Sequence, residues 1–171
     1  YGGVRYRRFC PGNSLDVTAV NASRAVLEDP ENMLMLFYTG KTRQASSILT
    51  EQKSNIAQRI EVLRDMTQQA EDVRRVIEAG DVSALGPLLH RGFDAKRRLA
   101  HNVSNDELDE IYERAVKAGA IGGKISGAGG GGFFLLCVPS DKRQSVRQAL
   151  GNLREMPFHL ERGGSRVILN M

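Results

Sequence analysis

Seven glycines fall within the eleven residues from Gly122 to Gly132, and the apolar stretch 133–138 follows them directly. Glycine is costly to order and has no side chain to pack, so a fold that gathers many glycines needs bare backbone there. Such backbone can adopt positive φ angles, approach a ligand closely and turn several N–H groups toward an anion. The chemistry that this stretch favours is therefore the binding of a phosphate group.

Two common phosphate loops do not fit this stretch. The pattern GxxxxGK[ST] fails because Ala118 takes the place of its leading glycine and Ile125 the place of its hydroxyl residue. The pattern GxGxxG is satisfied by Gly127, Gly129 and Gly132, but it requires a strand before it and a helix after it. We expect a helix upstream and a strand downstream. The remaining interpretation is a helix–loop–strand turn that packs against a separate nucleotide-binding lobe.

Alternating and continuous apolar runs predict the strands around this turn. The alternation near the N-terminus predicts a half-exposed strand, and the continuous apolar run that begins at Met33 predicts a buried one. Residues 162–164, Arg-Gly-Gly, are a hairpin signal. We expect strands over 3–9, 17–20, 33–38 and 133–138, followed by a hairpin of strands 157–161 and 165–169.

Helical periodicity fills the middle of the chain. It begins near residue 43, and apolar residues recur at three- and four-residue steps on one face of the stretch 52–79. Ser104 and Glu107 have the spacing of a capping box, which predicts the start of another helix there. Gly80 is expected to end the helix of the stretch 52–79, and Asp81 is expected to be the next N-cap. Pro87 suits the first turn of a further helix, which buries Leu88, Leu89, Phe93 and Leu99. Gly119 is expected to end the capping-box helix, and Gly151 to end a helix over 141–150.

These elements predict an α+β fold with a mostly antiparallel, ferredoxin-like sheet and a helical block packed on one face. Because the sequence contains no internal repeat and no linker, we expect residues 1–171 to form a single domain. The first residue is Tyr1 rather than Met, so a longer parent chain is expected.

Composition and charge limit the classes of partner that this chain is expected to bind. The net charge is +4, with basic clusters at residues 5–8 and 96–98, but aromatic residues make up only 6%, too few for a broad base-stacking surface. We expect solvated faces or a phosphorylated small-molecule partner, and neither nucleic acid nor a membrane, because no apolar run reaches about 20 residues. Cys10 and Cys137 make no disulfide framework, and Cys137 lies in an apolar run, which favours a buried thiol and a cytoplasmic protein.

Several motifs together resemble one family. Lys124-Ile-Ser-Gly-Ala-Gly-Gly-Gly-Gly132 followed by an apolar strand is similar to the third conserved motif of the GHMP kinases, which include galactokinase and mevalonate kinase. Leu34-Met-Leu-Phe-Tyr-Thr-Gly-Lys-Thr-Arg43 and Leu89-His-Arg-Gly-Phe93 with Lys96 resemble the D-glycero-D-manno-heptose 7-phosphate kinase branch. With Ser104-Asn105 and Ile111-Tyr112, the resemblance covers roughly residues 33–138.

The resemblance implies the C-terminal, substrate-side lobe of an ATP-dependent sugar kinase. Its most direct form is phosphorylation of heptose 7-phosphate at the anomeric hydroxyl, on a route to surface polysaccharide. The Gly-Leu-Gly-Ser-Ser loop and the acidic base of such kinases do not occur in this sequence. ATP and Mg²⁺ are thus expected to bind mainly to an N-terminal lobe of the same parent chain. This chain is expected to supply no catalytic residue and, alone, to be inactive.

Two alternatives stay open. One is another GHMP small-molecule kinase of the galactokinase, fucokinase or mevalonate type. The other is a non-catalytic binding or assembly module that could form homo-oligomers, because removal of a partner lobe would expose an apolar face.

The candidate site residues form two groups, and none has the spacing of metal ligands. Each has an ordinary structural role as its alternative, such as a tight turn, a helix cap or a helix surface. The phosphate and substrate loop is predicted at Lys124, Ser126, Gly127, Ala128, Gly129, Gly130 and Gly131, and the sugar-phosphate candidates are Thr39, Lys41, Arg43, His90 and Lys96. His90 and Lys96 lie roughly 240° apart around a helix and should not share a face.

Overall fold

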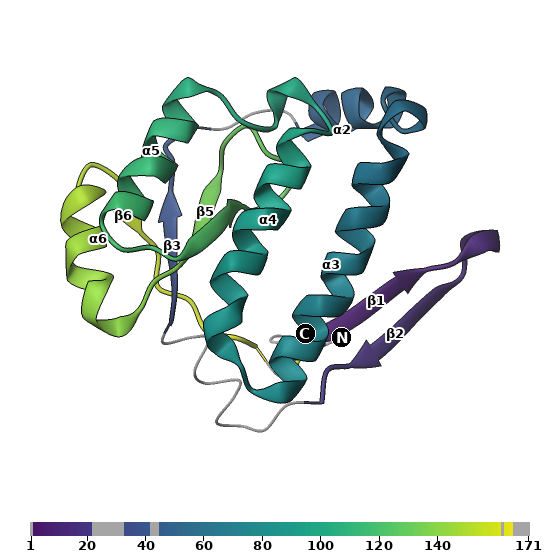
Figure 1. Ribbon diagram of the computed structural model, residues 1–171, viewed down its shortest axis with the longest axis horizontal. Coiled ribbons are helices and arrows are strands. Elements are labelled where there is room, and N and C mark those ends of the chain that lie inside the picture. Colours follow the sequence, from purple (N-terminus) through teal and green to yellow (C-terminus); the bar gives the residue numbers. More distant parts are fainter. Residues whose placement is uncertain (1, 22–32, 42–44, 162, 166–171) are drawn as a thin grey trace, which may run out of the picture.

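A four-stranded antiparallel sheet organises the chain in the computed structural model, which describes residues 2–21, 33–41, 45–161 and 163–165 (Figure 1). Strand β3 is central and pairs with β5 from Leu34 opposite Cys137 to Tyr38 opposite Phe133. The predicted α+β class with an antiparallel sheet is confirmed. The strands lie in the order β4 (Gly122–Ile125), β5 (Phe133–Cys137), β3 (Leu34–Tyr38) and β6 (Arg154–Glu155).

Five α-helices accompany the sheet in the described residues, joined in part by short 3₁₀ turns. Helix α4 runs beside the edge strand β4, and α3 lies on the outer side of α4 (Figure 1). The helices are α2 (Ala45–Ser54), α3 (Ile60–Ala79), α4 (Leu85–Arg97), α5 (Asp106–Lys117) and α6 (Arg143–Ala149).

The core lies on both sides of β3 and β5. On one face, Phe37 and Phe134 are almost fully buried and join a cluster with Phe93 of α4 and Tyr112 of α5. On the other face, a smaller cluster contains Leu34, Leu85, Leu89 and Cys137. Cys137 is the buried thiol that was expected, and burial raises its pKa to about 11.

The long helical face predicted over 52–79 is wrong in its N-terminal part. Helix α2 ends at Ser54, a 3₁₀ turn follows, and α3 begins at Ile60. Ile56 and Ile60, which the prediction placed on the apolar face of one continuous helix, lie at this break and are 48% and 44% exposed. The one buried residue of α3 is Gln69, whose Nε2 donates to the carbonyl of Leu88 at 2.6 Å.

Gln69 also fills the space beside Gly92 where α3 packs against α4. A Cβ atom placed on Gly92 of α4 would lie 2.9 Å from the Gln69 Oε1 atom. This spacing is tighter than real Cβ atoms show, so the glutamine side chain occupies the space that a side chain at residue 92 would need.

Several end signals are confirmed and three other assignments are corrected. Gly80 is the left-handed C-cap of α3, Pro87 lies in the first turn of α4, and α5 ends just before Gly119. The N-cap of α5 is Asn105 rather than Ser104, since the Asn105 side chain accepts from the Leu108 N–H at 3.0 Å.

The second correction concerns the glycine run itself. Residues 122–125 were expected to be loop, but they form β4, which pairs with β5. The third concerns the C-terminal hairpin: residues 157–161 carry no strand, and β6 pairs with β3 at Phe37 and Tyr38 instead. The expected second hairpin strand, apart from Ser165, lies outside the described residues.

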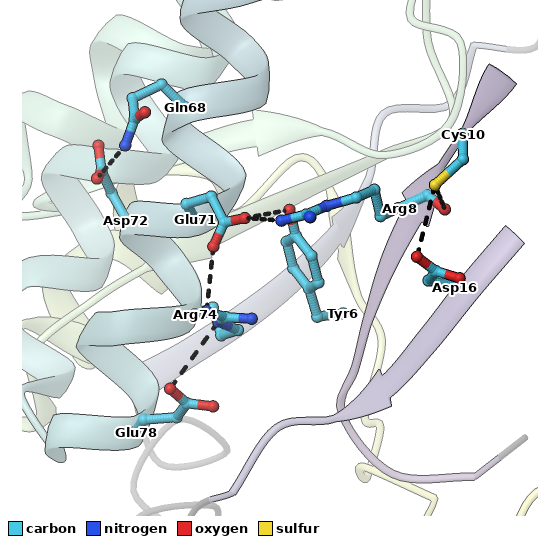
Figure 2. A network of polar contacts seen from close by, with 9 residues as sticks. All are labelled: Tyr6, Arg8, Cys10, Asp16, Gln68, Glu71, Asp72, Arg74 and Glu78. Carbon is cyan, nitrogen blue, oxygen red and sulfur yellow. Dashed lines mark hydrogen bonds and ion pairs between the residues drawn. The ribbon is translucent and has the colours of Figure 1, made fainter.

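A separate hairpin formed by β1 (Arg5–Phe9) and β2 (Leu15–Ala19) confirms the two N-terminal strands. Figure 2 shows how it is tied to α3: the Tyr6 hydroxyl donates to Glu71 Oε1 at 2.7 Å, and Arg8 donates to the same atom at 2.8 Å. The Arg74 guanidinium lies 4.9 Å from the Tyr6 ring centroid. Hydrogen bonds from Tyr6 and Arg8 lower the pKa of the Glu71 carboxyl.

The contact between α4 and β4 leads to a stability prediction. A Cβ atom on Gly122 would lie 1.9 Å from the Gly86 carbonyl oxygen, so Gly122→Ala must push the helix from the sheet. We expect a loss of at least about 3 kcal/mol in the free energy of unfolding, measured with urea. The control is Gly12→Ala, at φ +75° with no atom within 4 Å, which should cost only about 1 kcal/mol. Similar losses in the two variants would contradict the close contact.

Candidate functional site

The turn between β4 and β5, residues 126–132, is held by two backbone carbonyls that accept from it and by Thr39, which donates to it. The N–H of Gly130 donates to the Val103 carbonyl and that of Gly132 to the Lys41 carbonyl, both at 2.8 Å. Thr39 is 4% exposed and donates to the Gly132 carbonyl through both its N–H, at 2.9 Å, and its Oγ1, at 3.0 Å. The turn therefore joins the end of β3 to the segment between α4 and α5.

Two of these contacts leave no room for a side chain. A Cβ atom on Gly129, where φ is +112°, would lie 2.8 Å from the Val103 carbonyl oxygen. A Cβ atom on Gly131, where φ is +143°, would lie 2.8 Å from the Lys41 carbonyl oxygen. Bare backbone at these positions serves close packing within the chain. By contrast, nothing lies within 4 Å of a Cβ placed on Gly127.

The longest run of donors left for a ligand lies in the first half of the turn. Ser126 donates its N–H to the Phe133 carbonyl at 2.8 Å, and the N–H groups of Gly130 and Gly132 are also engaged. Across the described part of the chain, no acceptor is seen for the three consecutive N–H groups of Gly127, Ala128 and Gly129, nor for that of Gly131 between two engaged neighbours. A phosphate group at this turn would thus be bound at 127–129, which is narrower than the predicted loop.

Lys96 meets the open half of the turn. It lies in the last turn of α4, is half-buried, and its Nζ donates to the Gly127 carbonyl oxygen. Burial, followed by repulsion from the nearby Lys124, lowers the Lys96 pKa to about 8. A half-buried ammonium beside a second lysine has unmet attraction for an anion.

Both lysines line a groove of about 470 Å³ that runs between the β1–β2 hairpin and helices α3 and α4. Its floor is apolar and includes Val73, Leu89 and Phe93. No carboxylate is among the lining residues, and five side chains are basic. The groove thus suits an anion with a carbon skeleton; its basic residues are Arg5, Arg7, Arg74, Lys96 and Lys124.

The second predicted group is only partly assembled here. Thr39 and Lys41 contact the closed half of the turn, and the Lys41 Nζ is paired with Glu107 Oε2 at 2.9 Å. A cavity beside Thr39 is lined by two carboxylates, Glu107 and Glu110, and by two guanidinium groups, Arg114 and Arg154, so its lining has no excess of positive charge for an anion. Arg43 lies outside the described residues.

His90 belongs to a different contact. Its Nδ1 lies 2.7 Å from the Tyr112 hydroxyl, its Nε2 lies 3.3 Å from Asp94 Oδ2, and its ring stacks on Tyr112 at 5.7 Å between centroids. Burial raises the pKa of Tyr112 to about 12. As expected, His90 and Lys96 serve different surroundings, and only Lys96 lines the groove.

Sequence reasoning missed four contributors to this region. Arg74 was hidden in an ordinary helical pattern, and Arg5 and Arg7 were read as a solvated strand face. Val103 contributes through its backbone carbonyl, and a backbone contact cannot be predicted from the residue type. One sequence signal could have identified Arg74: it lies on the same helix face as Val73 and Ile77. A cation within an apolar face can pack its aliphatic part on that face and present its charge at the edge of an apolar groove.

The comparison with protein families identifies the class. The C-terminal domain model of the GHMP kinases matches residues 70–155, about half of the chain, so this chain belongs to that family. The match includes α4, α5, the glycine turn and α6, and it therefore includes both Lys96 and Lys124.

The individual relatives are sugar and small-molecule kinases. D-glycero-alpha-D-manno-heptose 7-phosphate kinase of Campylobacter jejuni is 28% identical over 152 residues, which cover 88% of this chain and 45% of the relative. Galactokinase of Thermococcus kodakarensis is 30% identical, over 75% of this chain and 45% of the relative. The L. major mevalonate kinase structure with R-mevalonate shares the fold, with a TM-score of 0.71 and 21% identity over 91% of this chain and 48% of that one. The chain spans about half the length of the curated relatives it matches.

The described residues contain no group of three or more His, Cys, Asp and Glu side chains placed to hold a metal ion. Within the same residues, no helix has the length and apolarity needed to cross a membrane.

The two halves of the turn should respond differently to substitution. Gly129→Ala forces Val103 away and is expected to cost about 3 kcal/mol of unfolding free energy, whereas Gly127→Ala should cost about 1 kcal/mol, the left-handed penalty alone. Urea unfolding of both variants measures the difference. Equal destabilisation would mean that residue 127 is as tightly packed as residue 129.

Proposed function

We propose that this chain is the substrate-side lobe of an ATP-dependent GHMP sugar kinase, and that the parent reaction transfers the γ-phosphoryl group of ATP to the anomeric hydroxyl of a heptose 7-phosphate. The observation that carries the proposal is the basic groove that Lys96 and Lys124 line within a GHMP kinase domain, with Lys96 also contacting Gly127 of the glycine turn. The similarity to a curated heptose 7-phosphate kinase supports the choice of sugar.

Phosphoryl transfer depends mainly on positioning and on neutralising charge, which the groove residues are suited to supply. The 7-phosphate of the sugar would lie between the ammonium groups of Lys96 and Lys124. The free N–H groups at 127–129 would bind a second phosphate oxygen, from ATP or from the product. The apolar floor would contact the carbon face of the sugar ring.

The groove does not fit a complete magnesium site, because no Asp or Glu lines it. Mg²⁺ prefers oxygen ligands, chiefly carboxylates and phosphates. Mg²⁺ would be held by ATP itself and by the proposed N-terminal lobe. Its chemistry there would be to neutralise charge on the transferring phosphoryl group. The same lobe would supply the base, so the single domain proposed for residues 1–171 binds substrate without catalysing the reaction.

The reaction is tested by measuring ADP release with ATP, Mg²⁺ and heptose 7-phosphate, for the full-length kinase that carries this lobe and for residues 1–171 alone. We expect sugar-dependent turnover with the full-length protein and none with the chain alone. Galactose, fucose and mevalonate serve as competing acceptors in the same assay. Preferred turnover of one of them would replace heptose as the substrate, and no turnover with any acceptor would contradict the kinase proposal.

The lowered pKa of Lys96 predicts a pH dependence of sugar-phosphate binding. Lys96 is charged below about pH 8 and neutral above it, while a phosphate monoester is already dianionic above its second pKa of about 6. The dissociation constant for the sugar phosphate should therefore rise about tenfold as pH increases from 7 to 9.5, because one charge-assisted hydrogen bond is lost when Lys96 becomes neutral. Calorimetric titration of residues 1–171 with heptose 7-phosphate measures it.

Two variants make this test specific. Lys96→Met should weaken binding at pH 7 and remove the pH dependence, whereas Lys117→Met, which removes an exposed lysine paired with Glu113, should change neither. A pH dependence that persists in Lys96→Met would assign the titration to another group.

One observation favours the alternative of an assembly module. Phe9 and Leu15 are directly paired across β1 and β2, and they are 82% and 44% exposed. An exposed apolar pair of this kind suits coverage by a partner lobe or a second copy. Light scattering of residues 1–171 tests for a second copy. If the chain is a monomer at high concentration, coverage by a second copy is excluded and coverage by a partner lobe is the remaining interpretation.

A further inference from the structure

A second basic cavity lies outside the groove. It has a volume of about 450 Å³ and is formed where the C-terminal end of α4 approaches the turn before α3. Arg97 and Arg98 continue the basic cluster that begins at Lys96, but they line this cavity and not the groove. Arg59 and His101 face the cavity from neighbouring turns, and Leu99 contributes an apolar, buried wall.

The charges around this cavity are not balanced. Arg97 is committed to the protein, since it forms ion pairs with Asp94 and Asp109. For Arg59 and Arg98, the described part of the chain offers no carboxylate within 4.0 Å, and no carboxylate is among the lining residues.

One acidic residue lies close by. Glu51 accepts the N–H of His101 at 2.8 Å and the side-chain amide of Asn102 at 3.0 Å. The backbone hydrogen bond from His101 lowers the pKa of this carboxyl. Its carboxylate is thus engaged by the His101 N–H and the Asn102 side chain, which leaves the two arginines as the uncompensated cations among the described residues that line the cavity.

We propose that this cavity is a second anion site, which binds a small molecule carrying a diphosphate group. Two exposed guanidinium groups from different elements can each form paired hydrogen bonds with phosphate oxygens. The volume exceeds that of one phosphate, and the apolar wall at Leu99 and Ala100 provides contact for a carbon-containing part of the ligand. This site does not depend on the proposed kinase reaction.

The lining favours a small ligand over nucleic acid. The cavity contains no Phe, Tyr or Trp among its lining residues, so it offers no aromatic platform on which bases could stack. A nucleic acid would also need a continuous basic path, whereas the neighbouring Arg97 is neutralised by two carboxylates.

The test uses inorganic pyrophosphate as the probe and backbone amide NMR shifts of residues 1–171 as the readout. We expect saturable shifts at Arg59 and at 98–101, with weaker binding of inorganic phosphate. The double variant Arg59→Gln/Arg98→Gln should weaken pyrophosphate binding at least tenfold. The matched control is Arg64→Gln/Arg75→Gln, which removes the same charge from arginines paired along α3 outside the cavity.

Three results would overturn the proposal. They are no saturable shift at millimolar pyrophosphate, shifts confined to residues around Lys96 and Lys124, or equal weakening in the test and control variants. The last result would show that binding follows overall charge. Far-ultraviolet circular dichroism of each variant verifies folding, and Arg59→Lys/Arg98→Lys provides a folded variant that keeps the charge but loses paired hydrogen bonding.

Discussion

Close approach of backbone to backbone is the constraint on which this lobe depends. Strand β4 touches α4 where Gly122 meets the Gly86 carbonyl, and the following turn touches the carbonyls of Val103 and Lys41. Each contact is possible only because a Cβ atom is missing. Three segments far apart in the chain thereby share one short turn, and Lys96 reaches the part of that turn left open.

The fold was largely predictable because its signals are local. Apolar runs located β3 and β5, and glycines located the helix ends. The errors arose where tertiary contacts decide: β4 consists mainly of glycine and has no strand pattern of its own, and the ends of α2 and α3 depend on a turn without Gly or Pro. At the site, residue types identified Lys96 and Lys124. They could not show that Lys41 is paired with Glu107 or that half of the turn's donors serve the protein itself.

The basic residues are divided among distinct tasks by small steps in sequence. Lys96 contacts the glycine turn, Arg97 holds α4 to α5 through Asp109, and Arg98 faces a separate cavity. Successive residues on a helix point about 100° apart, so one short cluster serves three surroundings. The net charge of +4 therefore predicts ligand binding less well than the pairing of each cation with its neighbours does.

The buried amide of Gln69 has a consequence for how this sequence can change over evolution. Its donor atom holds the Leu88 carbonyl, and its acceptor atom fills the space above Gly92. A larger residue at 92 requires the Gln69 side chain either to leave this position, and with it the Leu88 carbonyl, or to be replaced by a smaller one. Positions 69 and 92 should therefore change together among related sequences, although 23 residues separate them and neither residue touches the glycine turn in any recorded contact.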